Sequence, residues 1–403
     1  MAPPPLSGLK VVELARVLAG PWAGQVLADL GADVIKIEAP EGDDTRRWGP
    51  PFVHNPDGSR DAAYFHATNR GKRSVAVDFR TAEGRAIVRA LAREADVLIE
   101  NFKVGGLRRH GLDWESLRAE NPRLVYCSIS GFGQDGPYAA RPGYDFIVQG
   151  MGGIMDLTGA AEGEPQKSGV AFADIFTGLY AVIAIEAALA ARGKTGQGQH
   201  LDLALLDTQV GVLANQAMNY LVSGSAPTRL GNAHPNIVPY QAFPVADGRV
   251  IVAVGNDGQF RNLCAVLGRP ELAADPRFAT NAARVGNRAA LVPLIEARTA
   301  TFARADLLAA LEAAGVPAGP INSVADVFAD PQVIARGMRL DLPTGDGGSV
   351  PSVRMPVLMS DTPPAYAHAS PRLGADTASV LAGLGYDADE IARLAAAGVI
   401  RTG

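Results

Sequence analysis

The first third of the chain alternates between short apolar runs and longer segments whose apolar residues recur about every 3.6 positions. The short runs predict strands at 9–14, 34–37, 74–79, 96–100 and 124–129. The periodic segments predict helices at 21–30, 81–95 and 114–120. Strands that alternate with helices form a parallel sheet with helices on both faces. The pattern therefore predicts an α/β fold with a parallel sheet in the first domain.

Loops after the predicted strands are the expected place for a ligand, because open parallel sheets bind ligands beyond the carboxyl ends of their strands. These loops span residues 15–20, 38–47, 101–106 and 130–136. The first loop lacks the G-x-G-x-x-G pattern of dinucleotide sites, so a redox enzyme that binds NAD is not expected.

The rest of the chain predicts further domains. The most apolar segment, 175–191, has 17 residues, contains Glu186, and is short of the roughly 20 that a membrane span needs, so we expect a buried helix. A strand at 200–205 and a helix at 207–222 close the large domain. The predicted organisation is a large domain at 1–222, a linker at 223–246, a small α/β domain at 247–330 and a C-terminal segment at 331–403.

Composition narrows the class of protein. With 403 residues, 47% hydrophobic and 20% charged, the chain has the composition of a globular protein with two or three domains. Its net charge is −5 and it has no basic stripe, so a nucleic-acid partner is not expected. Cys127 and Cys264 form no C-x-x-C motif, and the six histidines lack ligand spacing, so no metal site is predicted. The start of the chain has no signal or transit pattern, which predicts a cytoplasmic protein without a membrane anchor.

Common catalytic motifs are missing, since no G-x-S-x-G, H-E-x-x-H or G-x-x-x-x-G-K-[ST] pattern occurs. Carboxylates, glycine-rich loops and three basic clusters remain, at 46–47, 70–73 and 108–109. Basic clusters of this kind are either solvated surface or the arginine forks of a phosphate-rich ligand site. The sequence leaves both readings open.

Asp174 is the most informative residue, because it opens a long apolar segment in which a charge is costly. It lies where the predicted helix should begin, and Asp is a good N-cap worth about 1 kcal/mol. A helix N-terminus also favours the ionised carboxylate, which is the form that attacks an acyl group. The two interpretations, a structural cap and a covalent nucleophile, are compatible.

A set of short motifs resembles the family III CoA-transferases over nearly the whole chain. The motifs are Leu6–Leu14 (LSGLKVVEL), Ala19–Pro21 (AGP), Leu27–Glu38 (LADLGADVIKIE), Asn69–Ser74 (NRGKRS), Glu100–Phe102 (ENF), Gly131–Gly133 (GFG), the Asp174 segment and Thr195–Gly198 (TGQG). The resemblance implies a large Rossmann-like domain built from both chain ends, a small α/β domain and an interlocked homodimer. It also implies that Asp174 is the nucleophile, with coenzyme A as a co-substrate, no permanently bound cofactor, and small carboxylic acids as partners in the reaction.

The same resemblance implies which residues contact CoA. They are Arg16, Val17, Leu18, Arg70, Lys72, Arg73, Asn101, Phe102, Arg109, Tyr144 and Asp145. Backbone amides near Gly131–Gly133 or in the loop 232–240 are candidate oxyanion donors. Asp145 is interpreted either as an Asx turn after Gly143 or as a carboxylate that positions a loop.

The loop 232–240 bears on the choice of acids. Formyl-CoA transferases carry a run of glycines there, whereas this chain has Asn-Ala-His-Pro-Asn-Ile-Val-Pro-Tyr. The loop looks more like the succinyl-CoA:glutarate branch, which handles dicarboxylates. His234, Asn236 and Tyr240 are therefore candidate acyl contacts, with loop packing as the alternative.

Two other functions are possible on the same fold. In 2-methylacyl-CoA racemases a histidine removes the α-proton, but the matching position here is Tyr144. Tyrosine is a poor general base at neutral pH, so racemase-type isomerisation is the alternative function and not the first choice. A CoA-binding protein without turnover is the third hypothesis, and it would need no nucleophile.

Overall fold

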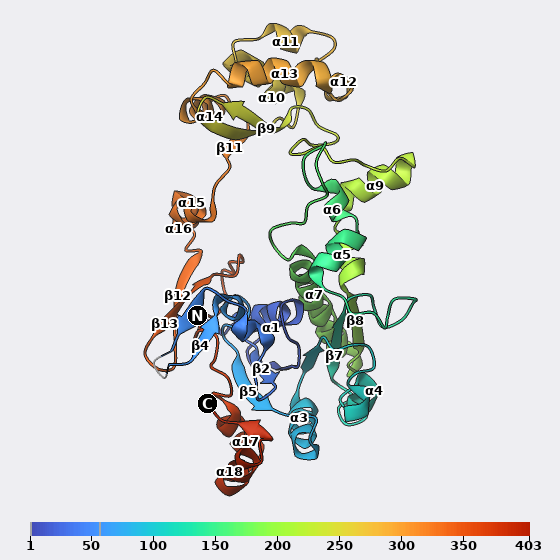
Figure 1. The fold of residues 1–403 in the computed structure, drawn as a ribbon, viewed down its shortest axis with the longest axis vertical. Helices are drawn as coiled ribbons and strands as arrows, with labels where there is room; N and C mark the ends of the chain where they lie inside the picture. The colour runs from blue at the N-terminus through green and yellow to red at the C-terminus, as the bar shows by residue number, and fades with distance from the viewer. Residues whose placement is uncertain (1, 56–57) are drawn as a thin grey trace. The chain divides into compact units, whose positions relative to one another are not determined.

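The computed structural model describes residues 2–55 and 58–403, and the chain forms two compact units (Figure 1). Unit 1 contains Met1–Gly153, Ser168–Ala217 and Ile334–Gly403. Unit 2 contains Ile154–Lys167 and Met218–Val333. The predicted linker and small domain both fall in unit 2, and so does the short segment Ile154–Lys167, which the sequence assigned to the large domain.

Unit 1 is built on a seven-stranded sheet with the order β14-β5-β2-β1-β6-β7-β8. The strands are β1 (Lys10–Glu13), β2 (Asp33–Glu38), β5 (Arg73–Val77), β6 (Val97–Glu100), β7 (Val125–Ser130), β8 (His200–Ala204) and β14 (Ile400–Arg401). All neighbours run parallel except β14, which pairs antiparallel with β5. The predicted α/β fold with a parallel sheet is confirmed, while the short strand β14 had no signal in the sequence.

The strand order reverses at β1. From β1 the chain first adds β2 on one side and later adds β6 on the other. The loops that follow β1 and β6 therefore lie next to each other at the carboxyl edge of the sheet. A crevice at such a reversal is the usual ligand site of open α/β sheets.

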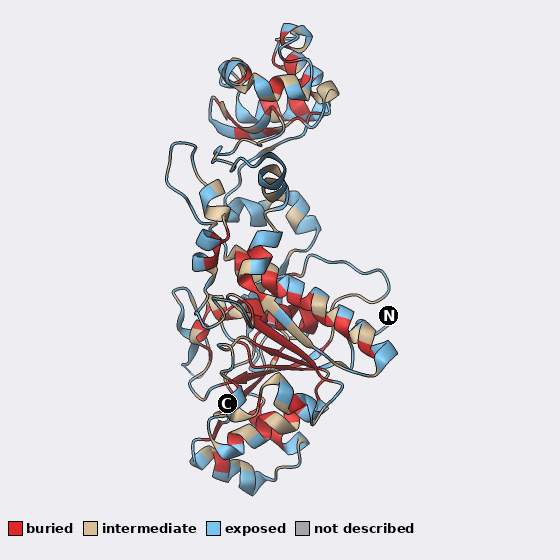
Figure 2. Ribbon diagram, turned by 90° about the vertical axis from the view of Figure 1, so that its right-hand side faces the viewer, coloured by how far each residue is buried: buried red, intermediate tan, exposed pale blue. Residues whose placement is uncertain are grey.

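Helices cover both faces of the sheet in unit 1. Val11 packs with α1 (Ala19–Asp29) and α7 (Phe172–Thr195), whereas its neighbour Val12 belongs to the core on the opposite face. That second face is covered by α3 (Ala82–Glu94), α4 (Trp114–Arg118), α17 (Thr377–Gly383) and α18 (Ala388–Ala396). Figure 2 shows the buried strands between the two layers.

Helix α7 is the central helix of its layer. It has 24 residues, and among the described residues it is the one helix long and apolar enough to cross a membrane by length and composition. Ala181, Val182 and Ile185 are buried in the same core as α1 and the sheet. An added Cβ at Gly178 would lie 2.7 Å from the carbonyl oxygen of Ala19, so this glycine lets the first turns of α7 and α1 approach closely.

Unit 2 has a three-stranded antiparallel sheet of β9 (Tyr240–Val245), β10 (Gly248–Ala253) and β11 (Ala318–Pro320). Its core includes Phe243, Phe260 and Leu307. The main helices are α10 (Asp257–Val266), α13 (Arg288–Thr299) and α14 (Arg304–Ala313). Strand β9 begins inside the segment predicted as a linker and contains Pro244, so the Gly- and Pro-rich composition overstated the length of the linker.

The helix predicted at 207–222 is divided into α8 (Leu205–Gly211) and α9 (Ala214–Ser223). Ala214 has φ +46°, and this left-handed residue interrupts the helical backbone. The remaining elements are β3 (Phe52–His54), β4 (Arg60–Ala62), β12 (Arg339–Pro343), β13 (Ser349–Val353), α2 (Ala63–His66), α5 (Asp145–Met151), α6 (Ile154–Leu157), α11 (Glu271–Ala274), α12 (Asn281–Gly286), α15 (Val324–Ala329), α16 (Pro331–Ala335), η1 (Asp44–Arg47) and η2 (Arg108–His110).

Candidate active site

A cavity of 460 Å³ opens in unit 1 at the carboxyl edge of the sheet. It is formed by the loops after β1, β6 and β7 and by the start of α7. Of the residues that the sequence predicted for the site, those lining this cavity are Arg16, Val17, Leu18, Asn101, Phe102, Arg109, Tyr144 and Asp174. Residues from four distant parts of the sequence thus meet in one place.

Asp174 is the third residue of α7, so the prediction that it caps the helix is wrong. The helix begins two residues earlier, at Phe172, and the preceding Ala171 has no side chain that could cap it. The carboxylate of Asp145 performs this task instead. Its Oδ1 accepts hydrogen bonds from the backbone N–H groups of Ala173 at 2.8 Å and Asp174 at 3.4 Å.

Asp145 is itself held in place by Gln149, which is buried. The Nε2 group of Gln149 donates to Oδ2 of Asp145 at 2.7 Å, and its Oε1 accepts from the backbone N–H of Ser168 at 2.9 Å. One glutamine therefore joins Asp145 to the loop before α7. Of the two interpretations of Asp145, these contacts favour the carboxylate that positions a loop, and Asp145 does not line the cavity.

Burial, and to a smaller extent the negative charge of Asp145, raise the pKa of Asp174 to about 7. Among the described residues, no cation forms an ion pair with Asp174 within 4.0 Å. A carboxylate with a raised pKa is a stronger nucleophile than that of an ordinary surface aspartate, because neither water nor a nearby cation stabilises its negative charge.

Tyr64 belongs to the surroundings of Asp174, although the sequence gave no reason to select it. Burial, together with the charges of Asp174, Asp145 and Asp43, raises the pKa of Tyr64 to about 12. Its ring packs edge-on against Trp48, with centroids 5.3 Å apart. It comes from the short helix α2, and only the fold brings it near the nucleophile.

The cavity is strongly basic. Besides Arg16 and Arg109, it is lined by three cations that were not predicted, Arg80, Lys103 and Arg141. Of the lining residues that the structure describes, Asp174 alone carries a carboxylate. Several cations around one open cavity suit a ligand with more than one phosphate group.

An aromatic wall completes this side of the cavity. Phe102 packs edge-on against Phe79 with ring centroids 5.7 Å apart, and the guanidinium of Arg16 lies 5.6 Å from the Phe102 ring. His110 packs against Phe79 in turn at 5.3 Å. A wall of this kind offers flat apolar surface beside the basic groups.

The cluster Arg70, Lys72 and Arg73 is not brought to the cavity in this chain. Arg70 is buried in an ion pair with Asp29, and Arg73 pairs with Asp33 near the start of β2. Lys72 is fully buried and pairs with Glu13 at 2.7 Å. Their part in CoA binding stays a prediction, whereas their contacts here are structural.

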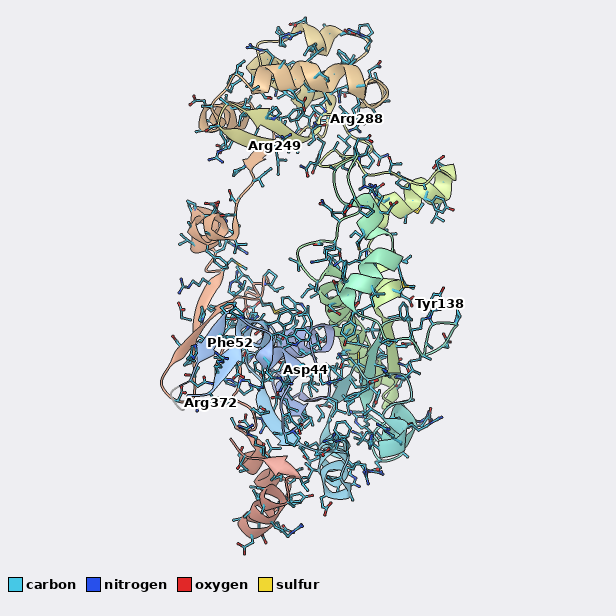
Figure 3. The ribbon with its side chains drawn as sticks, in the orientation of Figure 1. Asp44, Phe52, Tyr138, Arg249, Arg288 and Arg372 are labelled. Atoms are coloured by element: carbon cyan, nitrogen blue, oxygen red, sulfur yellow. The ribbon has the colours of Figure 1, made fainter. Side chains whose placement is uncertain are left out.

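His234, Asn236 and Tyr240 lie together in unit 2. The rings of His234 and Tyr240 are 5.1 Å apart, and Nδ1 of His234 accepts from the backbone N–H of Asn236 at 3.1 Å. Arg288, labelled in Figure 3, donates to the carbonyl oxygen of His234 at 2.6 Å. These contacts fix the conformation of the loop and leave its role in acid selection as a prediction.

Several amides that the sequence offered as oxyanion donors are already used. In the loop 232–240, the N–H groups of Ala233 and His234 donate to the carbonyl oxygens of Leu230 and Tyr240, respectively. The N–H of Asn236 donates to Nδ1 of His234, and that of Val238 donates to Oδ1 of Asn281. At the cavity, the N–H of Gly133 donates to Oγ of Ser130 at 2.9 Å. These five groups are therefore not free to stabilise an oxyanion.

Gly131 has a packing role at the cavity. An added Cβ would lie 2.5 Å from the Cα of Gly143, so the loop after β7 and the segment before α5 touch backbone to backbone.

In the part of the chain that the structure describes, no group of three or more His, Cys, Asp or Glu side chains could hold a metal ion.

The raised pKa of Asp174 predicts a stability effect. An aspartate has a pKa near 4 in the unfolded chain, whereas the pKa of Asp174 in the folded protein is about 7. Ionisation of Asp174 therefore lowers the free energy of unfolding progressively between pH 4 and 7, and the loss is complete above about pH 7. We expect Asp174→Asn to raise the melting temperature at pH 8 by roughly 5 °C. The gain should shrink as the pH falls toward 5. Calorimetry at both pH values tests this, with the exposed Asp156→Asn as the control, and a gain independent of pH would contradict the assignment.

Comparison with known proteins agrees with this geometry. A family model described as CoA-transferase family III matches residues 6–377. The succinate–glutarate CoA-transferase of Agrobacterium fabrum is 61% identical over 383 residues, covering 94% of this chain and 96% of that protein. The succinyl-CoA:glutarate CoA-transferase of Mus musculus is 43% identical, covering 98% and 90%. The crystal structure of a CaiB/BaiF family protein from Brucella suis has a TM-score of 0.85 and 64% identity, covering 95% and 100%.

The cavity at the strand-order reversal, lined by cations and by one carboxylate of raised pKa at the start of a helix, suits an acyl-group transferase that handles phosphate-bearing thioesters. The chain belongs to CoA-transferase family III. It is a CoA-transferase, with CoA thioesters as co-substrates, as the resemblance implied.

Proposed function

We propose that this enzyme transfers CoA from succinyl-CoA to glutarate through covalent intermediates on Asp174. The observation that carries the proposal is the placement of one basic carboxylate in a cavity whose other charged lining residues are cations. The names of relatives at 61% and 43% identity support the choice of donor and acceptor.

The reaction begins when a carboxylate oxygen of Asp174 attacks the thioester carbonyl of the donor. The C–S bond breaks, which gives a mixed anhydride and CoA thiolate. The thiolate then attacks the aspartyl carbonyl and releases the donor acid, leaving an aspartyl-CoA thioester. The acceptor carboxylate reverses these two steps and leaves with CoA, so the thioester bond is conserved without ATP.

The residues of the site have separate tasks in this scheme. The cations and the aromatic wall bind the phosphates and the adenine ring of CoA. Asp145 and the first turn of α7 fix the backbone of Asp174, so that its carboxylate stays in the cavity. Burial keeps water away from the anhydride and thioester, which hydrolysis would destroy.

We extend the proposal to a cytoplasmic homodimer. Helix α7 leaves Leu179, Tyr180 and Ile183 exposed at 38%, 44% and 61% in the single chain. Large apolar side chains at these levels of exposure fit a surface that a second copy covers.

Mass spectrometry of acyl-CoA products tests the choice of acids. The purified protein is incubated with succinyl-CoA and glutarate, itaconate, mesaconate, citramalate, malate, oxalate or acetate, each in a separate reaction. We expect glutaryl-CoA to form fastest. With glutarate labelled by ¹⁸O in its carboxylates, one label should pass through Asp174 into the released succinate. Fast product with an acid other than glutarate would change the acceptor, and succinate free of label would rule out the anhydride.

Isomerisation of acyl-CoA is the second candidate function, and one observation weighs against it. The residue that would serve as the base is Tyr144, which lines the cavity but is 61% exposed. A tyrosine hydroxyl is ionised only at alkaline pH. Deuterium uptake at the α-carbon of a branched acyl-CoA, without any transfer, would reverse this choice.

A further inference from the structure

Val17 has a backbone conformation that a β-branched residue rarely adopts. Its φ is +71°, in the left-handed region, and it lines the cavity together with Asp174. For such a residue this conformation is a true outlier that persists only where the surroundings enforce it. The turn from Ala15 to Leu18 therefore needs an explanation outside its own sequence.

Side chains from three other segments hold this turn. Oδ2 of Asp43 accepts from the backbone N–H of Val17 at 3.3 Å. Asn101 binds both backbone groups of Arg16, the residue before Val17. Its Oδ1 accepts from the N–H of Arg16 at 2.9 Å, and its Nδ2 donates to the carbonyl oxygen of Arg16 at 2.7 Å. Nζ of Lys36 donates to the carbonyl oxygen of Ala15 at 3.0 Å.

Asp43 and Lys36 form one buried unit. Their side chains are 0% exposed and lie 3.0 Å apart, and Lys36 also pairs with Glu13 at 3.1 Å. Oδ1 of Asp43 accepts from the N–H and hydroxyl of Thr45 at 3.0 and 2.8 Å, which fixes the carboxylate in orientation. The side chain of the next residue, Asp44, labelled in Figure 3, instead meets Arg16 and Arg47 at the surface.

A buried charged network is an expensive way to stabilise a fold, since removing charges from water costs about as much as their pairing returns. Here it holds the backbone of a strained turn that borders the nucleophile. Gly178 brings the start of α7 against Ala19, directly after that turn. An ordered and strained turn beside a reacting group is typical of a preorganised site.

We propose that Asp43 is a positioning residue for CoA transfer, which with Lys36 and Asn101 holds Val17 in the left-handed conformation and so keeps the turn aligned with Asp174. The inference rests on the proposed function, since Asp174 must be the group that the turn serves. It assigns catalytic importance to a residue that does not line the cavity.

Glycine at position 17 separates this role from simple support of the fold. Glycine adopts positive φ about as readily as negative φ, so it needs no clamp. We expect Asp43→Asn to lower kcat by about tenfold or more, because valine then leaves the left-handed region. Adding Val17→Gly to this variant should raise its kcat again by at least about fivefold, whereas Val17→Gly alone should not raise the kcat of the wild-type enzyme.

Steady-state kinetics of succinyl-CoA consumption measures the four proteins of this cycle, with the fraction of active sites counted by hydroxylamine trapping. Asp33→Asn is the matched control, because it removes an exposed carboxylate from β2, the strand that carries Lys36, and should leave kcat unchanged. A wild-type enzyme without turnover would reject the proposed function. A normal kcat in Asp43→Asn, or no recovery with glycine, would reject the positioning role alone.

Asp43→Asn leaves Lys36 with a weaker partner and could fail to fold. Asn101→Ala then replaces it in the same cycle, because Asn101 is half-buried and holds the turn without a charge. Recovery of kcat by Val17→Gly supports the inference in this form too. If Asn101→Ala loses activity and glycine restores none of it, the strained turn is not what these side chains control.

Discussion

Asp174→Ala is expected to abolish CoA transfer while the protein still binds acyl-CoA. The substitution removes the one carboxylate that lines the cavity among the described residues, so neither the anhydride nor the aspartyl thioester can form. We expect kcat to fall by at least about a thousandfold, since a covalent route is lost and not merely weakened. The basic and aromatic groups that bind CoA remain, so the dissociation constant for CoA should change by less than about threefold.

Product formation by mass spectrometry and CoA binding by calorimetry measure the two expectations separately. Hydroxylamine should trap residue 174 as a hydroxamate in the wild-type protein after incubation with succinyl-CoA, and it should trap nothing in Asp174→Ala. The exposed Asp156→Asn is the control and should behave as wild type in both assays. Residual transfer within tenfold of wild type would show that another group is the nucleophile. If neither the wild-type protein nor the variant transferred CoA, the result would favour a CoA-binding protein without turnover.

The sequence predicted the parallel sheet well because strand and helix periods differ clearly and because the sheet is buried on both faces. Val11 and Val12 are both apolar since each faces a helical layer, which is the pattern of a central parallel strand. The C-terminal strand β14 was missed because two residues carry no periodicity. Its position depends on pairing with β5 across the chain.

The site was predicted less evenly. Loops after β1 and β6 could be placed from topology alone, and Arg16 and Asn101 do meet there. Asn101, however, uses its side chain on the backbone of Arg16. The sequence shows that a polar residue lies in a loop, but it does not show whether the residue faces a ligand or its own chain.

The buried charges were the clearest missed signal. Glu13 and Lys36 each lie in an apolar strand, where a charge is costly unless it is paired. Both were treated as ordinary strand residues. Two opposite charges on neighbouring parallel strands could have been paired from the sequence, whereas the left-handed φ of Val17 could not, because a valine gives no indication of it.

Asp145→Asn should move the pH dependence of the reaction to lower pH. The negative charge of Asp145 raises the pKa of Asp174, so removing it lets Asp174 ionise at lower pH. The amide oxygen of asparagine, placed where Oδ1 lies, still accepts from the N–H of Ala173 and keeps the cap on α7, while the hydrogen bond from Gln149 to Oδ2 is lost. The acid limb of kcat/KM, expected near pH 7 in the wild type, should therefore shift down, because a deprotonated Asp174 is required for attack.

The same substitution should slow the enzyme at alkaline pH. Above pH 8 Asp174 is ionised in both proteins, but the less basic carboxylate of the variant is the weaker nucleophile, so we expect kcat/KM to fall several-fold. The two pH profiles should therefore converge below pH 7. Profiles of kcat/KM from pH 5 to 9 with saturating glutarate test this, and Asp156→Asn again controls for the loss of one charge. An unchanged acid limb together with a lower rate at every pH would mean that Asp145 acts on the helix alone and not on the charge of the nucleophile.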